Sequence, residues 1–203
     1  MTGKVYIASM NMRGKWATPP DGAIKVNVTS THAKTSKYRL AFSPMTPIEG
    51  GYKGYWNFES YWQSGKVFEG IPLEKSNKWW RELKEAKRRY PNSKGKKVLY
   101  SIFDGNHEKY DYVESRKKVY VPEYYNLIKD NKVLEDLRKK VEDGKDLVIY
   151  DFDGPREENG EVSCRKLSIE LLKEKINITR HPFGHGYVVA ASILGIEPAE
   201  YIE

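Results

Sequence analysis

The segment 147–152, Leu-Val-Ile-Tyr-Asp-Phe, is the most apolar strand-like run in the sequence. A short apolar run that is bounded by turn residues indicates a buried strand, and Asp-Gly-Pro follows directly at 153–155. Further strands are predicted at 4–9, 24–28, 38–42, 98–103, 110–113 and 119–121. Helices are predicted at 59–69, 76–90, 122–128, 133–141, 164–176 and 187–194. Because helices and strands are interleaved, we expect an α+β (mixed α/β) fold in which several helices surround a small mixed sheet.

The length of 203 residues fits one compact domain over 1–203, and neither a repeat nor a long Pro/Gly-rich linker divides it. No apolar run approaches the roughly 20 residues that a membrane-spanning helix needs, and the first residues carry no signal-peptide pattern. We therefore expect a cytoplasmic protein that makes no contact with a membrane. The single cysteine, Cys164, excludes an internal disulfide and a cysteine-rich zinc site. We expect neither a metal nor a cofactor.

The positive charge of the chain is concentrated in the helix-turn segment 75–97. The chain has a net charge of +7, and this segment alone holds ten basic residues against Glu82 and Glu85. With Trp79 and Tyr90 on the buried face of the helix, the cations would face water. Such a surface attracts nucleic acid through its phosphates, weakly and without sequence preference. The candidate nucleic-acid-binding residues are Lys78, Arg81, Lys84, Arg88, Arg89, Lys94, Lys96 and Lys97.

A second candidate site follows an aromatic loop at 55–58. At helical spacing, Glu59, Gln63 and Lys66 fall on one stripe. The stripe would place an acid, an amide and a cation in one pocket, where aromatic side chains stack on a planar base. The alternative is a solvent-facing stripe over an aromatic core. The candidate substrate-binding residues of this region are Trp56, Asn57, Trp62, Gln63 and Lys66.

The stretch Glu59-Ser-Tyr-Trp-Gln-Ser-Gly-Lys66-Val-Phe68 resembles the hallmark helix of the NADAR (YbiA-like) N-glycosidase family, Glu-x-x-x-Gln-x-x-Lys-x-Phe. The resemblance covers about 15 of 203 residues. The family's early Gly-x-Phe-Ser-Asn-Phe segment has at best a shifted relative at 52–58. The resemblance implies a small mixed domain that cleaves N-glycosidic bonds in ADP-ribose-type or riboside-phosphate substrates.

Two carboxylates follow the buried strand, Asp151 and Asp153, with Gly154 behind them. An apolar strand that ends in Asp-x-Asp-Gly resembles the nucleophile loop of haloacid-dehalogenase-like phosphatases. Only 49 residues follow Gly154, too few for the rest of that fold, and the residue types at 153–155 favour a plain turn instead. A third interpretation puts Asp151 or Asp153 in one pocket with Glu59, since sites in α/β folds lie at the carboxyl ends of strands.

The segment 180–186, Arg-His-Pro-Phe-Gly-His-Gly, precedes an apolar helix. Glycines at a helix start leave its first N–H groups open, which makes an anion site. The candidate phosphate-binding residues are Arg180, His181, Gly184, His185 and Gly186. The alternative is a glycine-rich cap on a buried helix. Pro182 and Gly184 separate the two histidines, so we do not expect a helical metal pair.

The residues predict a polar pocket beside aromatic side chains, and the NADAR resemblance implies the reaction: an N-glycosidase-like enzyme that acts on a phosphorylated nucleoside or an ADP-ribose-type molecule. Glu59, helped by Asp151 or Asp153, would stabilise an oxocarbenium-like sugar or activate water. Lys66 and the segment 180–186 would hold phosphate. The alternative is a basic nucleic-acid-binding protein without catalytic activity, which needs only the segment 75–97.

Overall fold

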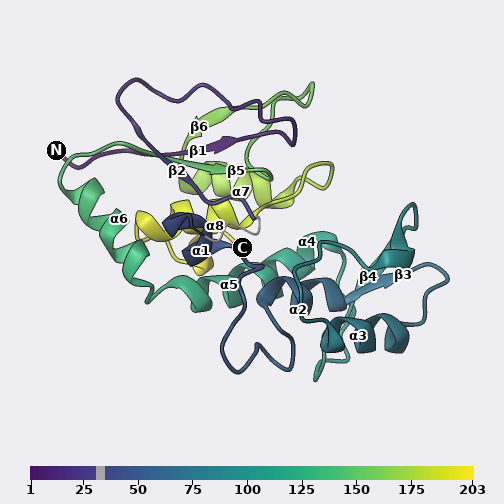
Figure 1. Ribbon diagram of the computed structural model, residues 1–203. Coiled ribbons are helices and arrows are strands. Elements are labelled where there is room, and N and C mark those ends of the chain that lie inside the picture. Colours follow the sequence, from purple (N-terminus) through teal and green to yellow (C-terminus); the bar gives the residue numbers. More distant parts are fainter. Residues whose placement is uncertain (31–34) are drawn as a thin grey trace. The chain divides into compact units, whose positions relative to one another are not determined.

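The computed structural model describes residues 1–30 and 35–203. They form two compact units, and Figure 1 shows their elements. Unit 1 consists of Met1–Ser43 and Arg116–Glu203, and unit 2 of Pro44–Ser115. That residues 1–203 behave as one domain stays a prediction.

Unit 1 is built on a four-stranded sheet with the order β2-β5-β1-β6. The strands are β1 (Val5–Ser9), β2 (Ile24–Asn27), β5 (Leu147–Asp151) and β6 (Cys164–Lys166). Strand β5 lies between β1 and β2 and runs parallel to both, whereas β6 is antiparallel to β1. Every residue of β5 is buried, as its apolar sequence predicts. The sheet is mixed, and the predicted α+β class is confirmed.

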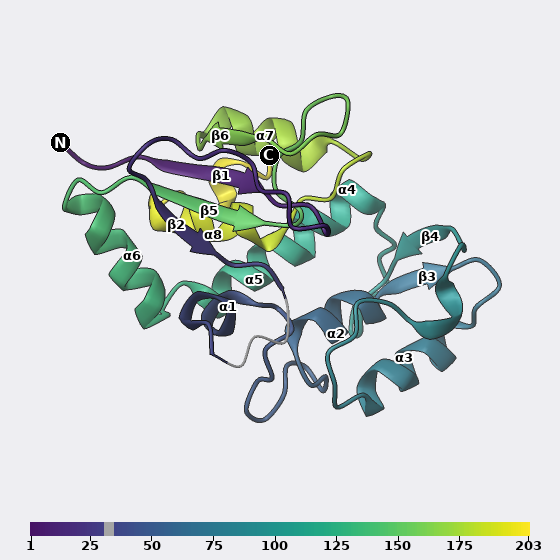
Figure 2. The ribbon, with the colours of Figure 1, turned by 45° about the horizontal axis from the view of Figure 1, so that its top comes forward.

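Helix α8 (His185–Ile193) is the buried helix of unit 1. It packs on β1 and β5 from below the sheet in Figure 2, and it also contacts α5 and α6. Every residue of α8 is buried, and most of them are apolar, as expected for a helix that is covered on all sides. The other helical segments are α1 (Lys37–Phe42), a π-helical turn (Arg116–Tyr120), α5 (Val121–Ile128), α6 (Lys132–Glu142), α7 (Ile169–Asn177) and a 3₁₀ turn (Pro198–Glu200).

Unit 2 combines short helices with a two-stranded sheet of β3 and β4. Its elements are α2 (Phe58–Ser64), β3 (Lys66–Phe68), α3 (Leu73–Glu82), a 3₁₀ turn (Pro91–Ser93), β4 (Val98–Ser101) and α4 (Tyr112–Ser115). Tyr61 is at the centre of its aromatic core, with ring contacts to Tyr52, Phe58 and Phe103.

Several predicted elements differ from the structure. The predicted strand 38–42 is helix α1, because Ser36 caps it by accepting a hydrogen bond from the Arg39 N–H. The predicted strands 110–113 and 119–121 are largely helical, and Asp111 and Glu114 exchange the reciprocal bonds of a capping box there. The predicted helix 164–176 begins as β6 and becomes helical only at Ile169. Two more predicted helices end early: 59–69 at Ser64 and 76–90 at Glu82.

Candidate functional site

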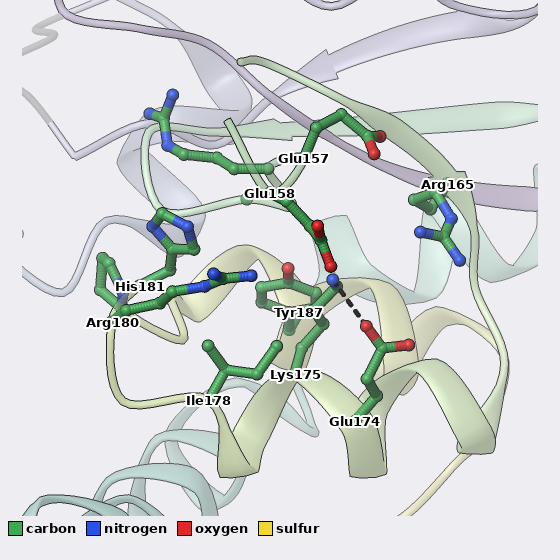
Figure 3. A pocket seen from close by; sticks show the side chains of 12 residues that line it. Glu157, Glu158, Arg165, Glu174, Lys175, Ile178, Arg180, His181 and Tyr187 are labelled. Carbon is green, nitrogen blue, oxygen red and sulfur yellow. Dashed lines mark ion pairs between the residues drawn. The ribbon is translucent and has the colours of Figure 1, made fainter. Parts of the chain in front are cut away.

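A polar cavity of about 370 Å³ opens in unit 1. Its volume falls within the roughly 300–1,000 Å³ that small-molecule sites occupy. Figure 3 shows that charged side chains from several segments surround it. The cavity is lined by Gly154, Arg156, Glu157, Glu158, Arg165, Glu174, Lys175, Ile178, Arg180, His181, Pro182 and Tyr187.

Four parts of the chain bring these side chains together. The loop after β5 supplies 154–158, β6 supplies Arg165, α7 and the segment after it supply 174–182, and α8 supplies Tyr187. The segment after α7 is held by Arg116, which is 1% exposed. The Arg116 guanidinium donates to the carbonyls of Ile176, Ile178 and His181 at 2.7–3.1 Å. One buried cation thus fixes the wall that carries Arg180 and His181.

The Tyr187 hydroxyl points into the cavity (Figure 3). Tyr187 is only 2% exposed, and its ring stacks on Phe183 with centroids 4.4 Å apart. Among residues 1–30 and 35–203, no group forms a hydrogen bond with this hydroxyl. Burial, reinforced by the nearby Asp151 carboxylate, raises the pKa of Tyr187. The phenol therefore stays protonated and can donate a hydrogen bond to a ligand.

His181 supplies a second group without a partner. Its Nε2 atom is buried and has no hydrogen bond within the described part of the chain. Burial, followed by the charges of Arg180 and Arg156, lowers the pKa of His181 from its ordinary 6.5. The ring is therefore neutral at neutral pH, in a region of positive potential.

The cations around the cavity fall into two kinds. Arg156 donates to the carbonyls of Phe152 and Gly160, and these hydrogen bonds hold the loop that carries Arg156. Lys175 lies 2.8 Å from Glu174 and lowers the pKa of that carboxyl. Arg165 and Arg180, in contrast, have no ion-pair partner among the described residues. Two guanidinium groups are thus available to an anion.

The predicted residues Asp151, Gly184, His185 and Gly186 lie together, and none of them lines this cavity. The Gly186 N–H donates to Oδ2 of Asp151 at 2.9 Å, and His185 Nδ1 lies 3.4 Å from the same oxygen. His185 Nε2 lies 2.6 Å from the Val28 carbonyl oxygen. A Cβ at position 186 would stand 2.6 Å from the Asp151 Cβ, so this close approach requires glycine.

The first turn of α8 therefore receives a carboxylate of the protein itself. A negative charge at a helix N-terminus is stabilised by the N–H groups and the helix dipole. The glycines predict open N–H groups at this helix start, but the Gly186 N–H is already hydrogen-bonded to the Asp151 carboxylate. Phosphate binding by Gly184, His185 and Gly186 stays a prediction.

Asp153 and Gly154 form a turn after β5. The Gly154 N–H donates to the Asp151 carbonyl at 3.4 Å, as the turn interpretation predicts. The Asp153 carbonyl accepts from the Gly184 N–H at 3.3 Å, and its side chain is exposed. Catalysis by either aspartate stays a prediction.

In unit 2 the predicted stripe of Glu59, Gln63 and Lys66 is divided. Gln63 Nε2 donates to Glu59 Oε1 at 2.7 Å, which confirms the neighbourhood of these two residues. Lys66 belongs to β3, because α2 ends at Ser64, and its Nζ lies 5.8 Å from the Trp62 ring centroid. Glu59 is in unit 2 and Asp151 in unit 1, and a pocket common to both stays a prediction.

The aromatic and amide groups of this region have structural contacts. Asn57 is buried: its Oδ1 accepts from the Ser60 N–H at the start of α2, and its Nδ2 donates to the Met45 carbonyl. Trp62 is 8% exposed and stacks on Phe103, with centroids 5.7 Å apart. One face of the Trp62 ring is therefore covered by a protein ring. Trp56 is half-buried.

The predicted basic residues divide in a similar way. Lys78 and Arg81 lie on α3, where Lys78 is 3.8 Å from Glu82 and Arg81 pairs with Asp104. The others lie outside the helix, on the segment that leads to β4, and are exposed: Lys84, Arg88, Arg89, Lys94, Lys96 and Lys97.

A family model described as "Family of unknown function (DUF6939)" matches residues 18–166, well over half of the chain. The chain belongs to this family. No curated protein matches it, and no solved structure does. The assignment to the NADAR family is wrong, since the matching family is DUF6939. The structure also gives a physical reason, because the motif requires a helix through Lys66.

In this DUF6939 chain Arg180 and His181 were predicted from the sequence as site residues, whereas Tyr187, Arg165 and Arg116 were not. Tyr187 has the apolar spacing of a core residue, and only the unpartnered hydroxyl distinguishes it. The family match ends at residue 166, before α7 and α8. Within the described residues, no helix is long and apolar enough to cross a membrane, and no group of three or more His, Cys, Asp or Glu side chains is placed to hold a metal.

Proposed function

We propose that the cavity of unit 1 binds a small phosphate-carrying molecule of the phosphorylated-nucleoside class. The observation that carries this proposal is the hydroxyl of the buried Tyr187, which points into the cavity and has no hydrogen-bond partner among the described residues, beside the guanidinium groups of Arg165 and Arg180, which have no ion-pair partner there. Arginine matches the geometry of phosphate oxygens with two parallel N–H bonds. A buried donor is most stable when a ligand supplies its acceptor.

The carboxylates of the cavity support a ligand with hydroxyl groups as well as phosphate. Glu157 and Glu158 line the same space as Arg165 and Arg180, so the lining is mixed in charge. A carboxylate accepts hydrogen bonds from sugar hydroxyls, whereas a phosphate prefers the guanidinium groups. A sugar phosphate or a nucleotide offers both kinds of group in one molecule, which inorganic phosphate does not.

The N-glycosidase reaction was implied by a family resemblance that is now replaced. It stays a prediction that Glu59→Gln would test by nucleotide turnover, separately from binding in this cavity, because Glu59 belongs to unit 2 and does not line the cavity. The proposed ligand class needs no metal or cofactor from the protein. We also propose a cytoplasmic location, where phosphorylated nucleosides are available to the cavity.

Isothermal titration calorimetry with AMP, ribose 5-phosphate, adenosine and inorganic phosphate tests the proposal. We expect the two organic phosphates to bind more tightly than adenosine or phosphate. Loss of one hydrogen bond to a charged group costs about 1.5–3 kcal/mol, so Tyr187→Phe should weaken the binding of AMP or ribose 5-phosphate by about 10- to 100-fold.

Tyr201→Phe is the matched control, because Tyr201 is also buried and its hydroxyl also lacks a partner in the described residues. It does not line the cavity, so its loss should leave binding unchanged. Equal affinities in the parent and in Tyr187→Phe, or no binding of any organic phosphate, would contradict the proposal.

A further inference from the structure

The segment 83–97 of unit 2, here called the basic segment, connects α3 to β4 (Figures 1 and 2). It contains seven Lys or Arg residues and a single acidic residue, Glu85. All of these charged side chains are exposed. The basic segment is therefore the most positively charged surface feature of unit 2.

The backbone of the basic segment is fixed by its few buried residues. Leu83 and Tyr90 are buried, and Trp79 lies against Tyr90 in an edge contact with centroids 5.4 Å apart. The Ser93 hydroxyl donates to the Tyr90 carbonyl at 2.8 Å, and the Lys96 N–H donates to the Ser93 carbonyl at 3.0 Å. Because the apolar side chains point into unit 2, the cations between them face water.

Most of these cations are not neutralised by the protein. Lys87 lies 3.4 Å from Glu85. Five others have no ion-pair partner among residues 1–30 and 35–203: Lys84, Arg89, Lys94, Lys96 and Lys97. On α3 itself, in contrast, Lys78 and Arg81 both have carboxylate partners. Of the cations on α3, only the exposed Lys75 lacks an ion-pair partner in the described residues, so most of the unpaired positive charge lies beyond the helix.

We propose that the basic segment binds the phosphate backbone of nucleic acid without sequence preference. Several exposed cations at close spacing neutralise successive phosphates and release condensed counterions, which drives this type of binding. Lysine, which makes up five of the seven basic residues, acts as a point charge and not as a reader of base edges.

A protein partner would need different chemistry at this surface. Protein interfaces depend on a central aromatic or aliphatic anchor and are depleted in lysine. Between Lys84 and Lys97 the larger apolar side chain, Tyr90, is buried in unit 2, and Ala86 is half-buried. Within the basic segment the surface therefore offers charge without an anchor. The exposed apolar side chains Val98 and Leu99 lie beyond it, on β4.

Fluorescence anisotropy with a labelled 20-base-pair duplex and the full chain tests this proposal. We expect a dissociation constant of about 10⁻⁴ to 10⁻⁶ M at physiological salt, with a steep dependence on salt concentration. The variant Lys84→Glu/Arg89→Glu/Lys94→Glu should bind at least about tenfold more weakly. Its salt slope should fall by about 2 to 3, since each lost phosphate contact removes about 0.9.

The matched control is Lys15→Glu/Lys132→Glu/Lys145→Glu, which changes the net charge of the chain by the same amount. These three lysines are exposed and have no ion-pair partner in the described residues, and none lies in the basic segment. The control should retain most of the affinity. Changing the same three segment residues to Gln in place of Glu guards against unfolding caused by charge reversal.

Three outcomes would overturn the proposal. The first is that the parent chain does not bind the duplex at low salt. The second is that the two triple Glu variants lose affinity equally, which would mean that only the net charge of the chain matters. The third is binding to phosphatidylserine-containing vesicles that is as tight, at equal phosphate concentration, as binding to the duplex. None of these measurements involves the cavity of unit 1, so they test the basic segment independently of the proposed small-molecule function.

Discussion

Asp151 Oδ2 accepts the Gly186 N–H at 2.9 Å and lies 3.4 Å from His185 Nδ1. The last residue of β5 is thereby joined to the first turn of α8, 35 positions along the chain. Asp151 is 2% exposed and His185 is 4% exposed, so water does not screen this contact. The same turn of α8 carries Tyr187, and its position in the cavity depends on this connection.

A double-mutant cycle between Asp151→Asn and His185→Gln measures the strength of this contact. We expect each single change to lower the free energy of unfolding, with a coupling of about 0.5–3 kcal/mol, the range for residues in contact. Urea denaturation gives the values. The control cycle uses Lys37 and Asp136, whose side chains are 3.0 Å apart but exposed. Its coupling should be clearly smaller, and equal couplings would show that burial adds nothing.

The pKa of His181 depends on the burial of its ring and on the charges around the cavity. Its pKa should lie below 6.5, because burial and the neighbouring arginines disfavour the imidazolium. In the pH range between that lowered value and 6.5, the unfolded chain binds more protons, so stability should increase with pH there. His181→Asn should remove this contribution. A bound phosphate compound should raise the pKa of His181. NMR titration of His181 with and without AMP measures this change, and an equal pKa in both titrations would contradict the prediction.

Arg116 should be essential for the cavity wall. Arg116→Met leaves three carbonyls without their donor, and removing one partner of a buried charged network costs about 3–5 kcal/mol. Denaturant unfolding should show this loss, whereas Arg13→Met, at an exposed arginine, should change stability little. A loss of less than about 1 kcal/mol in Arg116→Met would mean that the wall is held by other contacts.

Asn57 tests the structural interpretation of the aromatic loop. Asn57→Ala removes the N-cap of α2 together with the bond to Met45, and loss of a cap alone costs about 0.5–2 kcal/mol. Asn57→Asp keeps the cap acceptor and removes only the donor, so it should cost less. If Asn57→Ala left the thermal midpoint unchanged and altered only ligand binding, the substrate role predicted from the sequence would be the better one.

The sequence predicted those elements whose pattern reflects burial alone. The run 147–152 contains β5, which ends at Asp151, and the spacing of Leu134, Leu137 and Val141 is that of α6. The helix predicted over 76–90 ends at Glu82, and Leu83 and Tyr90 are buried through an irregular segment whose spacing matches that of a helix by coincidence. Periodicity reports which side chains are buried, and it does not report the backbone between them.

The candidate site was only partly predictable for a related reason. Arg180 and His181 are polar residues beside glycines, a pattern visible in the sequence. Arg165 lies on a three-residue strand, and its place at the cavity follows from the antiparallel pairing of β6 with β1. Arg116 is a basic residue among other basic residues, and no local pattern marks it as the one that is buried. The place of Arg165 at the cavity and the burial of Arg116 both arise from contacts between segments far apart in the sequence.

The strand order has a consequence for the folding of this protein during its synthesis on the ribosome. Neither β1 nor β2 has a sheet partner until residues 147–151 have been made, because β5 lies between them. Unit 2, in contrast, is one continuous stretch, Pro44–Ser115, and all of its strand pairing is internal. Chains acquire structure during synthesis as their segments become complete. Unit 2 should therefore gain its native contacts first. Strands β1 and β2 should remain without their sheet partner until β5 has been synthesised.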